Sequence, residues 1–277
     1  CISIGPAGEM KMSAASIAFT DMEQRPTRHA GRGGVGAVMG AKGVKVIVID
    51  DAGTSARVPA DPEKFKAANK EFVAGLRKHP VTGEGLPAYG TNVLTNVINE
   101  AGGYPTRNFS TGQFEGASKI SGETQAELEN ARGGEGSATH GCHRGCVIRC
   151  SGTFYDKNGR FLTKQVEYET VWAHGGNCGI DDLDAIAQID RLDDDYGVDT
   201  IELGAAIAVA MEGVSPNLVM PKPLSIWLKK SAKAPPWEKS WVMVRPSPAR
   251  CSVWKECRWL KIRPCRLTIR GLSRALA

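Results

Sequence analysis

The order of hydrophobic and polar positions differs between the first fifty residues and the rest of the chain. Apolar residues flank a serine in residues 2–4 and are concentrated in residues 44–49, patterns typical of buried strands, and residues 10–19 are predicted to form a short helix between them. From Asp61 onward the apolar residues recur every three or four positions, which indicates helices. The chain is therefore predicted to be α+β, with strands early and a mostly helical second part.

The helical part begins with clear end signals. Asp61 can cap a helix whose first turn contains Pro62, and Phe65 and Phe72 mark its apolar face. Asn158-Gly159 predicts the turn of a hairpin within residues 152–161. Four further helices are expected, some of them ended by glycine pairs: residues 92–101, 123–131, 183–196 and 200–211.

Composition changes at about residue 213. Residues 213–277 contain 14 Lys and Arg and 2 acids, a net charge of +12, whereas residues 1–212 contain 21 and 28, a net charge of −7. The last 65 residues also hold five of the six tryptophans and eight of the fifteen prolines, without a helical or strand period. Two explanations stay open: a basic, aromatic nucleic-acid-binding segment, or translation in the wrong reading frame, which predicts no packed domain.

The first residue is a cysteine. A lipidated N-terminal cysteine would be followed by a polar tether, whereas residues 2–8 are typical of a buried strand that enters a turn. We therefore expect residue 1 to be an internal point of a longer protein. No run of eighteen apolar residues occurs, so no membrane span is predicted.

Glycines are concentrated in residues 28–40. The run does not end in Gly-Lys-Ser/Thr, which excludes a P-loop, and a dinucleotide-binding fingerprint needs a strand before the glycines, whereas the clear predicted strand follows them. Backbone amides exposed by the glycines, with Arg28 and Arg32 beside them, suit a phosphate or another anion. The alternative is close packing of backbone against backbone.

Three of the eight cysteines, Cys142, Cys146 and Cys150, lie within nine residues. This clustering indicates a metal ion or an iron–sulfur cluster rather than disulfides. In a continuous helix the three positions would spread over about 12 Å, too far for one cluster, so the segment is predicted to fold back as a loop. Gly141 and Gly145 give it the freedom to do so.

The residues around these cysteines are cationic and are expected to favour thiolates: His143, Arg144 and Arg149. One alternative is three inert thiols in a reducing compartment. Another is a zinc-stabilised nucleic-acid-binding module, in which His140 completes a tetrahedral set with the three cysteines and the basic tail contacts nucleic acid.

Four segments together resemble the aldehyde ferredoxin oxidoreductase family: residues 28–42, the cysteine loop 141–150, Glu167-Tyr168-Glu169-Thr170, and residues 177–184 running into 194–199. They occur in the family's order. The resemblance implies that residues 1–56 are the C-terminal part of a β-rich, pterin-binding N-terminal domain. Residues 57–212 would form a mostly helical iron–sulfur and pterin-binding domain, and residues 213–277 an unrelated, irregular tail.

The resemblance also implies an activity. Enzymes of this family oxidise an aldehyde to a carboxylic acid at tungsten or molybdenum held by two pterins, and a [4Fe–4S] cluster passes the electrons to ferredoxin. The chain is therefore expected to be a fragment of a cytoplasmic oxidoreductase, inactive by itself. Its expected partners are ferredoxin or a similar carrier and an aldehyde, with a homodimer as one option for assembly; neither a membrane nor nucleic acid is expected.

By resemblance, Cys142, Cys146 and Cys150 are three of the four cluster ligands, and the fourth belongs to a domain this chain lacks. The family spaces the first pair by two residues and this chain by three, so the path of the loop must differ. The resemblance assigns pterin binding to eight residues: Ala30, Gly31, Arg32, Gly33, Gly34, Asp194, Gly197 and Asp199. For the last three, the alternative is a helix end at which Gly197 is left-handed.

A glutamate of the segment 167–170 lies beside the metal in the family, where it can orient water or transfer a proton. Glu167 and Glu169 alternate along a predicted strand, so only one of them is expected to face the pocket. Glu169 is favoured over Glu167. The alternative is that both are surface acids at a strand edge.

Overall fold

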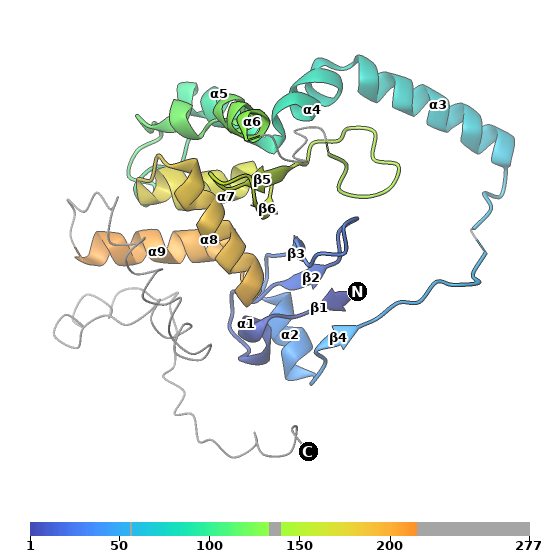
Figure 1. Ribbon diagram of the computed structural model, residues 1–277, viewed down its shortest axis with the longest axis horizontal. Coiled ribbons are helices and arrows are strands. Elements are labelled where there is room, and N and C mark those ends of the chain that lie inside the picture. The colour runs from blue at the N-terminus through green and yellow to red at the C-terminus, as the bar shows by residue number, and fades with distance from the viewer. Residues whose placement is uncertain (56, 133–139, 215–277) are drawn as a thin grey trace. The chain divides into compact units, whose positions relative to one another are not determined.

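The computed structural model describes residues 1–55, 57–132 and 140–214, which belong to one compact unit, Cys1–Lys230 (Figure 1). A second unit, Ser231–Ala277, lies outside the described residues. Residues 213–277 are predicted to form no packed domain, and all of these residues except 213 and 214 lie outside the described residues. None of the described helices is long and apolar enough to cross a bilayer.

The first fifty residues form a four-stranded antiparallel sheet with two short helices. The strands are β1 (Ile2–Ser3), β2 (Ile17–Phe19), β3 (Arg28–Ala30) and β4 (Val46–Ile47), in the order β3-β2-β1-β4. The helices are α1 (Pro6–Glu9) and α2 (Val35–Ala41). Ala18 of β2 pairs with His29 of β3. This register holds β3 in place, and β3 lines one side of the candidate site described below.

Two expectations for this part are wrong. The helix predicted over residues 10–19 does not form, because Lys11 turns the chain at φ 58° and Ser16 N–H donates to Gly197 O at 2.8 Å. Long-range pairing therefore overrides the local helical pattern. The buried strand predicted over residues 44–49 is reduced to β4, and Val46 and Ile47 are exposed.

The second part is mostly helical, as expected, with one hairpin of β5 (Thr153–Tyr155) and β6 (Phe161–Lys164). Its helices are α3 (Pro62–Lys78), α4 (Leu86–Tyr89), α5 (Leu94–Glu100), α6 (Gly122–Ala131), α7 (Tyr168–Thr170), α8 (Leu183–Tyr196) and α9 (Thr200–Val214). Short helical turns lie at Val81–Gly85, Thr91–Val93, Ala117–Ile120, Val171–Gly175 and Gly176–Cys178. The mixture of an antiparallel sheet and separate helices is compatible with the α+β class.

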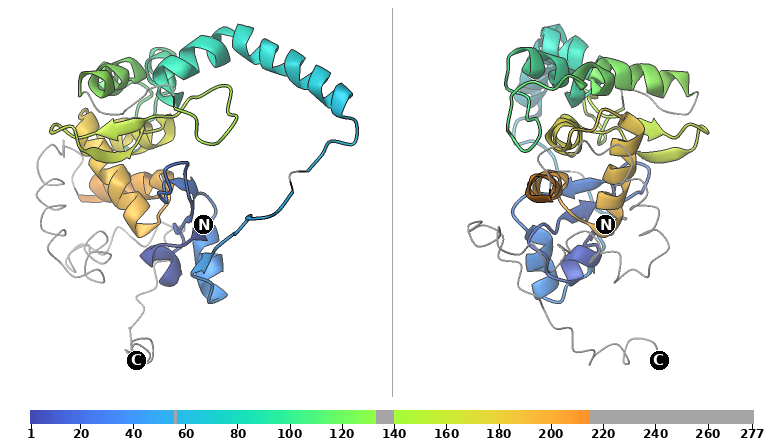
Figure 2. Two further views of the ribbon diagram at one scale, coloured as in Figure 1. Left: turned by 45° about the vertical axis from the view of Figure 1, so that its right-hand side comes forward. Right: turned by 90° about the vertical axis from the view of Figure 1, so that its left-hand side faces the viewer.

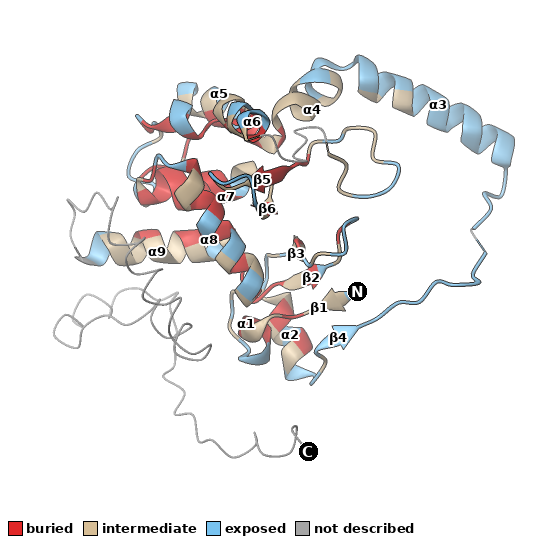
Figure 3. Ribbon diagram, in the orientation of Figure 1, coloured by how far each residue is buried: buried red, intermediate tan, exposed pale blue. Residues whose placement is uncertain are grey.

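Helix α3 begins where the sequence predicts, because Asp61 Oδ1 accepts a hydrogen bond from Lys64 N at 3.0 Å. Its apolar face is not covered by the described residues. Phe65 is 58% exposed and Phe72 is 65% exposed, and none of its residues is buried (Figure 3). The end signals in the sequence thus predict where the helix begins, but they do not predict which residues cover its apolar face.

The main hydrophobic core lies where α8 and α9 meet the turn Val171–Gly175, shown in red in Figure 3. Ile186 of α8 and Val171 are fully buried there. Gly204 allows α9 to approach closely, since a Cβ at that position would lie 2.7 Å from Ala173 O. This core holds the end of α8 and the start of α9 in place.

The helical part is joined to the sheet by main-chain contacts. Ala15 and Val198 form an antiparallel bridge, and Asp199 N–H donates to Ala14 O at 2.8 Å. Gly197, at φ 69°, has no room for a Cβ, which would lie 2.8 Å from Gly5 N. As a result, the end of α8 (gold) lies beside the N-terminal strands (blue) in both views of Figure 2.

Candidate functional site

A cavity of about 780 Å³ opens where β3, β6, α7 and the junction of α8 with α9 meet. Nine of the residues to which the family resemblance assigns a role line it: Ala30, Gly31, Arg32, Cys142, Cys150, Glu167, Glu169, Asp194 and Asp199. Four others do not: Gly33, Gly34, Cys146 and Gly197. Segments separated by more than a hundred residues therefore contribute to one cavity.

The cysteine segment folds back as a loop, as its spacing predicted. His140 and Ser151 close its base, with His140 N–H to Ser151 O at 2.6 Å and Ser151 N–H to His140 O at 3.0 Å. Gly145 has φ 80°, a value that favours glycine. Arg149 also has a positive φ, 56°, and its N–H donates to Cys146 Sγ at 3.4 Å. The loop therefore directs a backbone donor at one of the three sulfurs.

The three cysteines are free thiols. Cys142 and Cys146 are hydrogen-bonded neighbours, and both influence the pKa of Cys150. Three soft sulfur donors on one loop suit an iron–sulfur cluster. Within the described ranges, however, no group of three or more His, Cys, Asp or Glu side chains is arranged to hold a metal ion by itself.

The expectation that cationic neighbours favour thiolates is wrong for two of these cysteines. Burial raises the pKa of both Cys142 and Cys150 above the ordinary thiol value. Arg28 opposes the rise at Cys142, whereas Glu167 adds to it at Cys150. The predicted cations of the loop, His143, Arg144 and Arg149, are exposed to solvent instead.

Arg28 links the cysteine loop to the acidic side of the cavity. Its Nη2 donates to Ser151 Oγ at 2.5 Å, and its Nη1 lies 3.7 Å from Glu167 Oε1. Its Nε is buried and has no hydrogen-bond partner among the described residues. An N–H group that is buried beside a cavity is available to an oxygen or nitrogen acceptor of a bound group, so the donor set fits a polar, heteroatom-rich ligand.

Both glutamates of the 167–170 segment line the cavity, so the expectation that only one would face it is wrong. The reason is local structure: the segment is the short helix α7 with Glu167 at its N-cap, not a strand. Glu167 Oε2 accepts from Thr91 Oγ1 at 2.6 Å, and burial raises the pKa of Glu167. Glu169 is exposed and accepts from Trp172 Nε1 at 2.6 Å.

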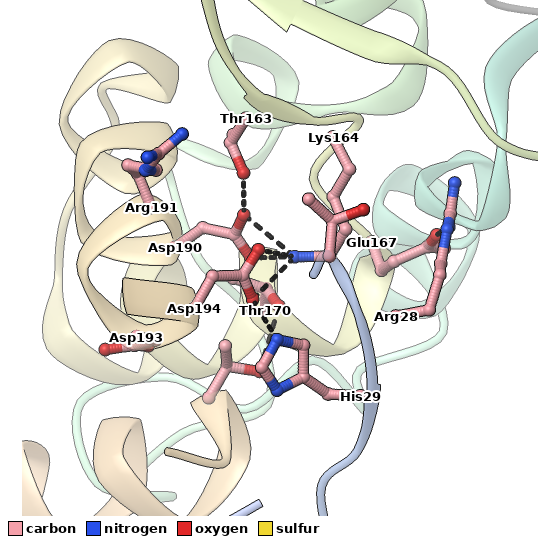
Figure 4. Close-up of polar contacts among 12 residues, drawn as sticks. Arg28, His29, Thr163, Lys164, Glu167, Thr170, Asp190, Arg191, Asp193 and Asp194 are labelled. Carbon is pink, nitrogen blue, oxygen red and sulfur yellow. Dashed lines mark hydrogen bonds and ion pairs between the residues drawn. The ribbon is translucent and has the colours of Figure 1, made fainter. Parts of the chain in front are cut away.

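A cluster of buried charges forms the wall at the end of α8 (Figure 4). Lys164 Nζ lies 3.0 Å from both oxygens of Asp190 and 3.0 and 3.2 Å from those of Asp194. Burial by itself lowers the pKa of Lys164, but the two carboxylates outweigh it and raise the pKa above the ordinary value. Thr163 Oγ1 donates to Asp190 Oδ2 at 2.6 Å, so both oxygens of Asp190 accept hydrogen bonds within the cluster.

His29 of β3 reaches the same cluster. Its Nε2 lies 3.2 Å from Asp194 Oδ1, and its Nδ1 lies 2.7 Å from Ser16 Oγ. Burial, followed by the charge of Lys164, lowers the pKa of His29 to about 4, so the ring is neutral at pH 7. The hydrogen-bond network assigns the proton to Nε2, with Nδ1 accepting from Ser16.

Both interpretations of the glycine-rich segment, close backbone packing and space for a ligand, apply to different glycines within it. Gly34, Gly36 and Gly40 pack against backbone; a Cβ on Gly34 would lie 2.5 Å from Ser13 O. Gly33, in contrast, has φ 87° and open space around its Cβ position. The order is strand β3, glycines, helix α2, and not the order inferred from the sequence, but β3 is antiparallel to β2, so it is not a βαβ dinucleotide fold.

The segment 194–199 both ends a helix and contributes two acids to the cavity. Gly197, at φ 69°, ends α8 in the left-handed conformation, as the structural alternative predicted. Asp199 Oδ2 caps α9 by accepting from Glu202 N at 3.1 Å. Gly31 lies against Asp199, since a Cβ at position 31 would be 2.8 Å from Asp199 Oδ1. Helix-end geometry thus brings both acids to the cavity.

Sequence reasoning missed four residues of this site: His29, Thr91, Lys164 and Asp190. Asp190 lies in the interior of a predicted helix, where an acid is usually on the solvated face. Lys164 follows an ordinary hairpin turn. Only the tertiary contacts identify them, because no local spacing connects a lysine to acids 26 and 30 positions later.

Two family models match the chain. One, described as aldehyde ferredoxin oxidoreductase, domains 2 and 3, matches residues 67–226, and the other, the N-terminal domain of the same family, matches residues 1–51. The chain belongs to the aldehyde ferredoxin oxidoreductase family. The match of this oxidoreductase family continues to residue 226, beyond the boundary at 212 expected from composition.

Curated members of the family are similar over the same region. A tungsten-containing aldehyde ferredoxin oxidoreductase of Pyrococcus horikoshii is 46% identical over 211 residues, and one of Thermococcus kodakarensis is 44% identical over 211 residues. An aliphatic sulfonate oxidoreductase, WOR-like subunit, of Pyrococcus furiosus is 28% identical over 215 residues. Each comparison covers 76% of this chain and 32% of the relative, so the chain spans about a third of their length.

These findings do not favour the zinc-stabilised nucleic-acid-binding module. His140 Nε2 is hydrogen-bonded to Glu23 Oε1 at 2.7 Å, which leaves only Nδ1 without a hydrogen-bond partner among the described residues. Membership in an oxidoreductase family explains the three thiols without a fourth ligand from His140.

Proposed function

We propose that this chain forms part of an enzyme that oxidises an aldehyde with water to a carboxylic acid, releasing two protons and two electrons. The observation that supports this most directly is the single cavity lined by the glycine-rich segment, the cysteine loop and the acids of α7 and α8. Ferredoxin or a similar carrier would receive the electrons, and the enzyme would be cytoplasmic.

In this proposal Cys142, Cys146 and Cys150 hold a [4Fe–4S] cluster, and the cavity binds one pterin of a tungsten or molybdenum centre. The metal–pterin group, when bound, supplies the two-electron oxidation and the cluster supplies one-electron transfer. The pterin would lie along Ala30–Arg32, with the Nε–H of Arg28 as a donor to one of its acceptors. Asp194 and Asp199 would accept from its N–H groups.

The two glutamates are proposed to have different tasks. Glu167 is held by Thr91 and Arg28, which suits a fixed carboxylate between the cluster ligands and the cavity. Glu169 is exposed to the cavity, and its Oε1 lies 3.5 Å from Arg32. A carboxylate with this access can orient the water and take the proton that aldehyde oxidation releases.

The cluster can be tested on the chain itself. We expect anaerobic reconstitution with ferrous iron and sulfide, with a small thiol as fourth ligand, to give about four irons per chain and a visible charge-transfer band. Cys146→Ser should lose both, because it removes one of the three loop thiols. Cys1→Ser, which removes an exposed thiol outside the loop, is the matched control.

Retention of a full cluster by Cys146→Ser would contradict this assignment. Equal loss in Cys1→Ser would also count against it, because the iron would then be bound without selectivity. Binding of a single zinc ion in place of iron would favour the zinc-stabilised module instead.

A further inference from the structure

Some residues of the charge cluster at the end of α8 line the cavity, and one lies behind them. Asp194 and Lys164 line the cavity, whereas Asp190 is fully buried behind them. The three residues come from two elements, with Lys164 on β6 and both acids one turn apart on α8. In Figure 4, dashed lines join the ammonium of Lys164 to both carboxylates.

The hydrogen bonds of Asp194 account for most of its acceptor capacity. Oδ1 accepts from Lys164 Nζ at 3.2 Å and Oδ2 accepts from it at 3.0 Å, and His29 Nε2, which is hydrogen-bonded to Pro26 O, lies 3.2 Å from Oδ1. A carboxylate has about four acceptor positions, so Asp194 is fixed on one side and retains capacity on the other. That remaining capacity is at the wall of the cavity.

The cluster carries a net charge of −1 when Lys164 is charged, both acids are ionised and His29 is neutral. Without Lys164, two carboxylates would face each other out of water, and one of them would take up a proton. Burial and the charge of Asp190 both raise the pKa of Asp194, and the charge of Lys164 and its hydrogen bonds to Asp194 oppose that rise. A protonated Asp194 would offer the cavity one acceptor fewer.

We propose that Lys164 is a positioning residue, which holds Asp194 in place as an ionised acceptor for a heterocycle with adjacent N–H donors, such as the pyrimidine edge of a pterin. Asp190 anchors Lys164 from behind, and His29 fixes the orientation of the Asp194 carboxylate from β3. The inference rests on the proposed function, because it assumes that a pterin occupies this cavity. Lys164 itself does not contact the ligand in this arrangement.

The test uses the full 277-residue chain and a fluorescent pterin, pterin-6-carboxylate, as the probe. Binding is measured by fluorescence titration at pH 7. We expect Lys164→Met to weaken binding about ten- to hundredfold, the range for loss of hydrogen bonds to a charged group. Lys119→Met is the matched control, because Lys119 forms an exposed ion pair with Asp181 and should leave the affinity unchanged.

A double-mutant cycle separates positioning from general damage. In an Asp194→Asn background, Lys164→Met should have little further effect on the pterin affinity, because its effect passes through Asp194. Lys164→Arg keeps the charge and can bridge both carboxylates, so it should restore most of the affinity. A purely structural role would instead give additive losses that follow the loss of stability.

The outcomes distinguish this inference from the function on which it rests. Failure of the unmodified chain to bind the probe would overturn the pterin site, and this inference with it. Probe binding by the unmodified chain together with equal binding by Lys164→Met, or additive losses in the cycle, would overturn the role of Lys164 alone. If Lys164→Met does not fold, Asp190→Asn replaces it in the same cycle, since it removes the anchor of Lys164 and keeps a buried amide.

Discussion

Glu129 is a buried acid in the structure that has only neutral partners. Its Oε1 accepts from Gln125 Nε2 at 3.1 Å and its Oε2 from Gln165 Nε2 at 3.4 Å, while Gln125 in turn accepts from Asn92. Burial raises the pKa of Glu129 to about 7, and the hydrogen bond from Gln125 only partly opposes the rise. The neutral form is therefore favoured in the folded protein.

This shift makes stability depend on pH with a defined sign. Between the ordinary value of 4.5 and about 7, the unfolded chain releases the proton of Glu129 and the folded chain keeps it, so the free energy of unfolding falls as pH rises. Glu129→Gln removes this loss, which amounts to about 3 kcal/mol above pH 7. The new amide can donate to Gln165 Oε1, which lacks a partner within the described segments, once the Gln165 amide turns over so that its oxygen and not its nitrogen faces position 129.

Urea unfolding at pH 4 and pH 8 checks the prediction. The advantage of Glu129→Gln over the unmodified chain should be larger at pH 8 than at pH 4. Glu127→Gln, on the exposed face of the same helix, controls for the removal of one negative charge. An advantage that does not change with pH would show that Glu129 is not neutral in the folded protein.

At the residue scale the sequence identified most side chains with obvious chemistry. Cysteines, glycines and the paired glutamates can be recognised by type and spacing, and five of these residues line the cavity: Gly31, Cys142, Cys150, Glu167 and Glu169. Lys164 and Asp190 could not be recognised, because their role depends on burial that the sequence does not show. The pKa of the loop thiols was misjudged for the same reason: desolvation outweighs nearby charge.

At the scale of elements, α1 and α2 show how closely two short helices can pack. Gly40 of α2 lies directly against Gly8 of α1, and any Cβ at position 40 would collide with the Gly8 carbonyl. We expect Gly40→Ala to lower the free energy of unfolding by about 1–3 kcal/mol, the usual cost of overpacking.

The matched control lies in α3. Gly75 is inside that helix, and no heavy atom of the described chain lies within 4 Å of its Cβ position beyond its own neighbours. Gly75→Ala should therefore raise the free energy of unfolding by about 0.5–1 kcal/mol, since alanine is the better helix former. Chemical unfolding measures both; destabilisation by both variants would show that helix contact is not what distinguishes the two sites.

The predictions of secondary structure were correct where contacts close in sequence determine the element and wrong where distant contacts determine it. Helices α3, α6 and α8 have local signals, such as the Ser121 cap whose Oγ accepts from Thr124 N at 3.4 Å, and their bounds match the sequence closely. The segment 10–19 and the segment 167–170 failed, because distant partners determine their conformation. Residues 10–19 alone do not show whether they form a helix or a strand, because the outcome depends on the hydrogen bond from Ser16 to Gly197.

For the molecule as a whole, the chain spans about a third of the length of the relatives it matches. Among the described residues, two of the three loop thiols, Cys142 and Cys150, and one pair of acids, Asp194 and Asp199, line its cavity. We expect the 277-residue chain alone, supplied with iron, sulfide and tungstate or molybdate, to show no aldehyde-dependent reduction of a viologen dye. Reduction of the dye with metal bound would contradict this expectation.

The same scale limits what sequence could predict. The family resemblance, the α+β class and the presence of strands early in the chain were within reach, because they depend on patterns along the chain, whereas β2 and β3 were not predicted. How the cavity forms was not, because it requires Ala15 beside Val198 and His29 beside Asp194. No periodicity encodes pairs separated by that much sequence.

The main-chain joint between Ala15 and Val198 also has a consequence for synthesis. Ribosomes add roughly 5–20 residues per second, and about 165 residues separate His29 from Asp194. The first wall of the cavity is therefore complete roughly 8–33 seconds before the second exists. During that interval residues 14–16, which lead into β2, lack the backbone partner that residues 197–199 later provide, so this edge of the nascent N-terminal part is open to chaperones and proteases.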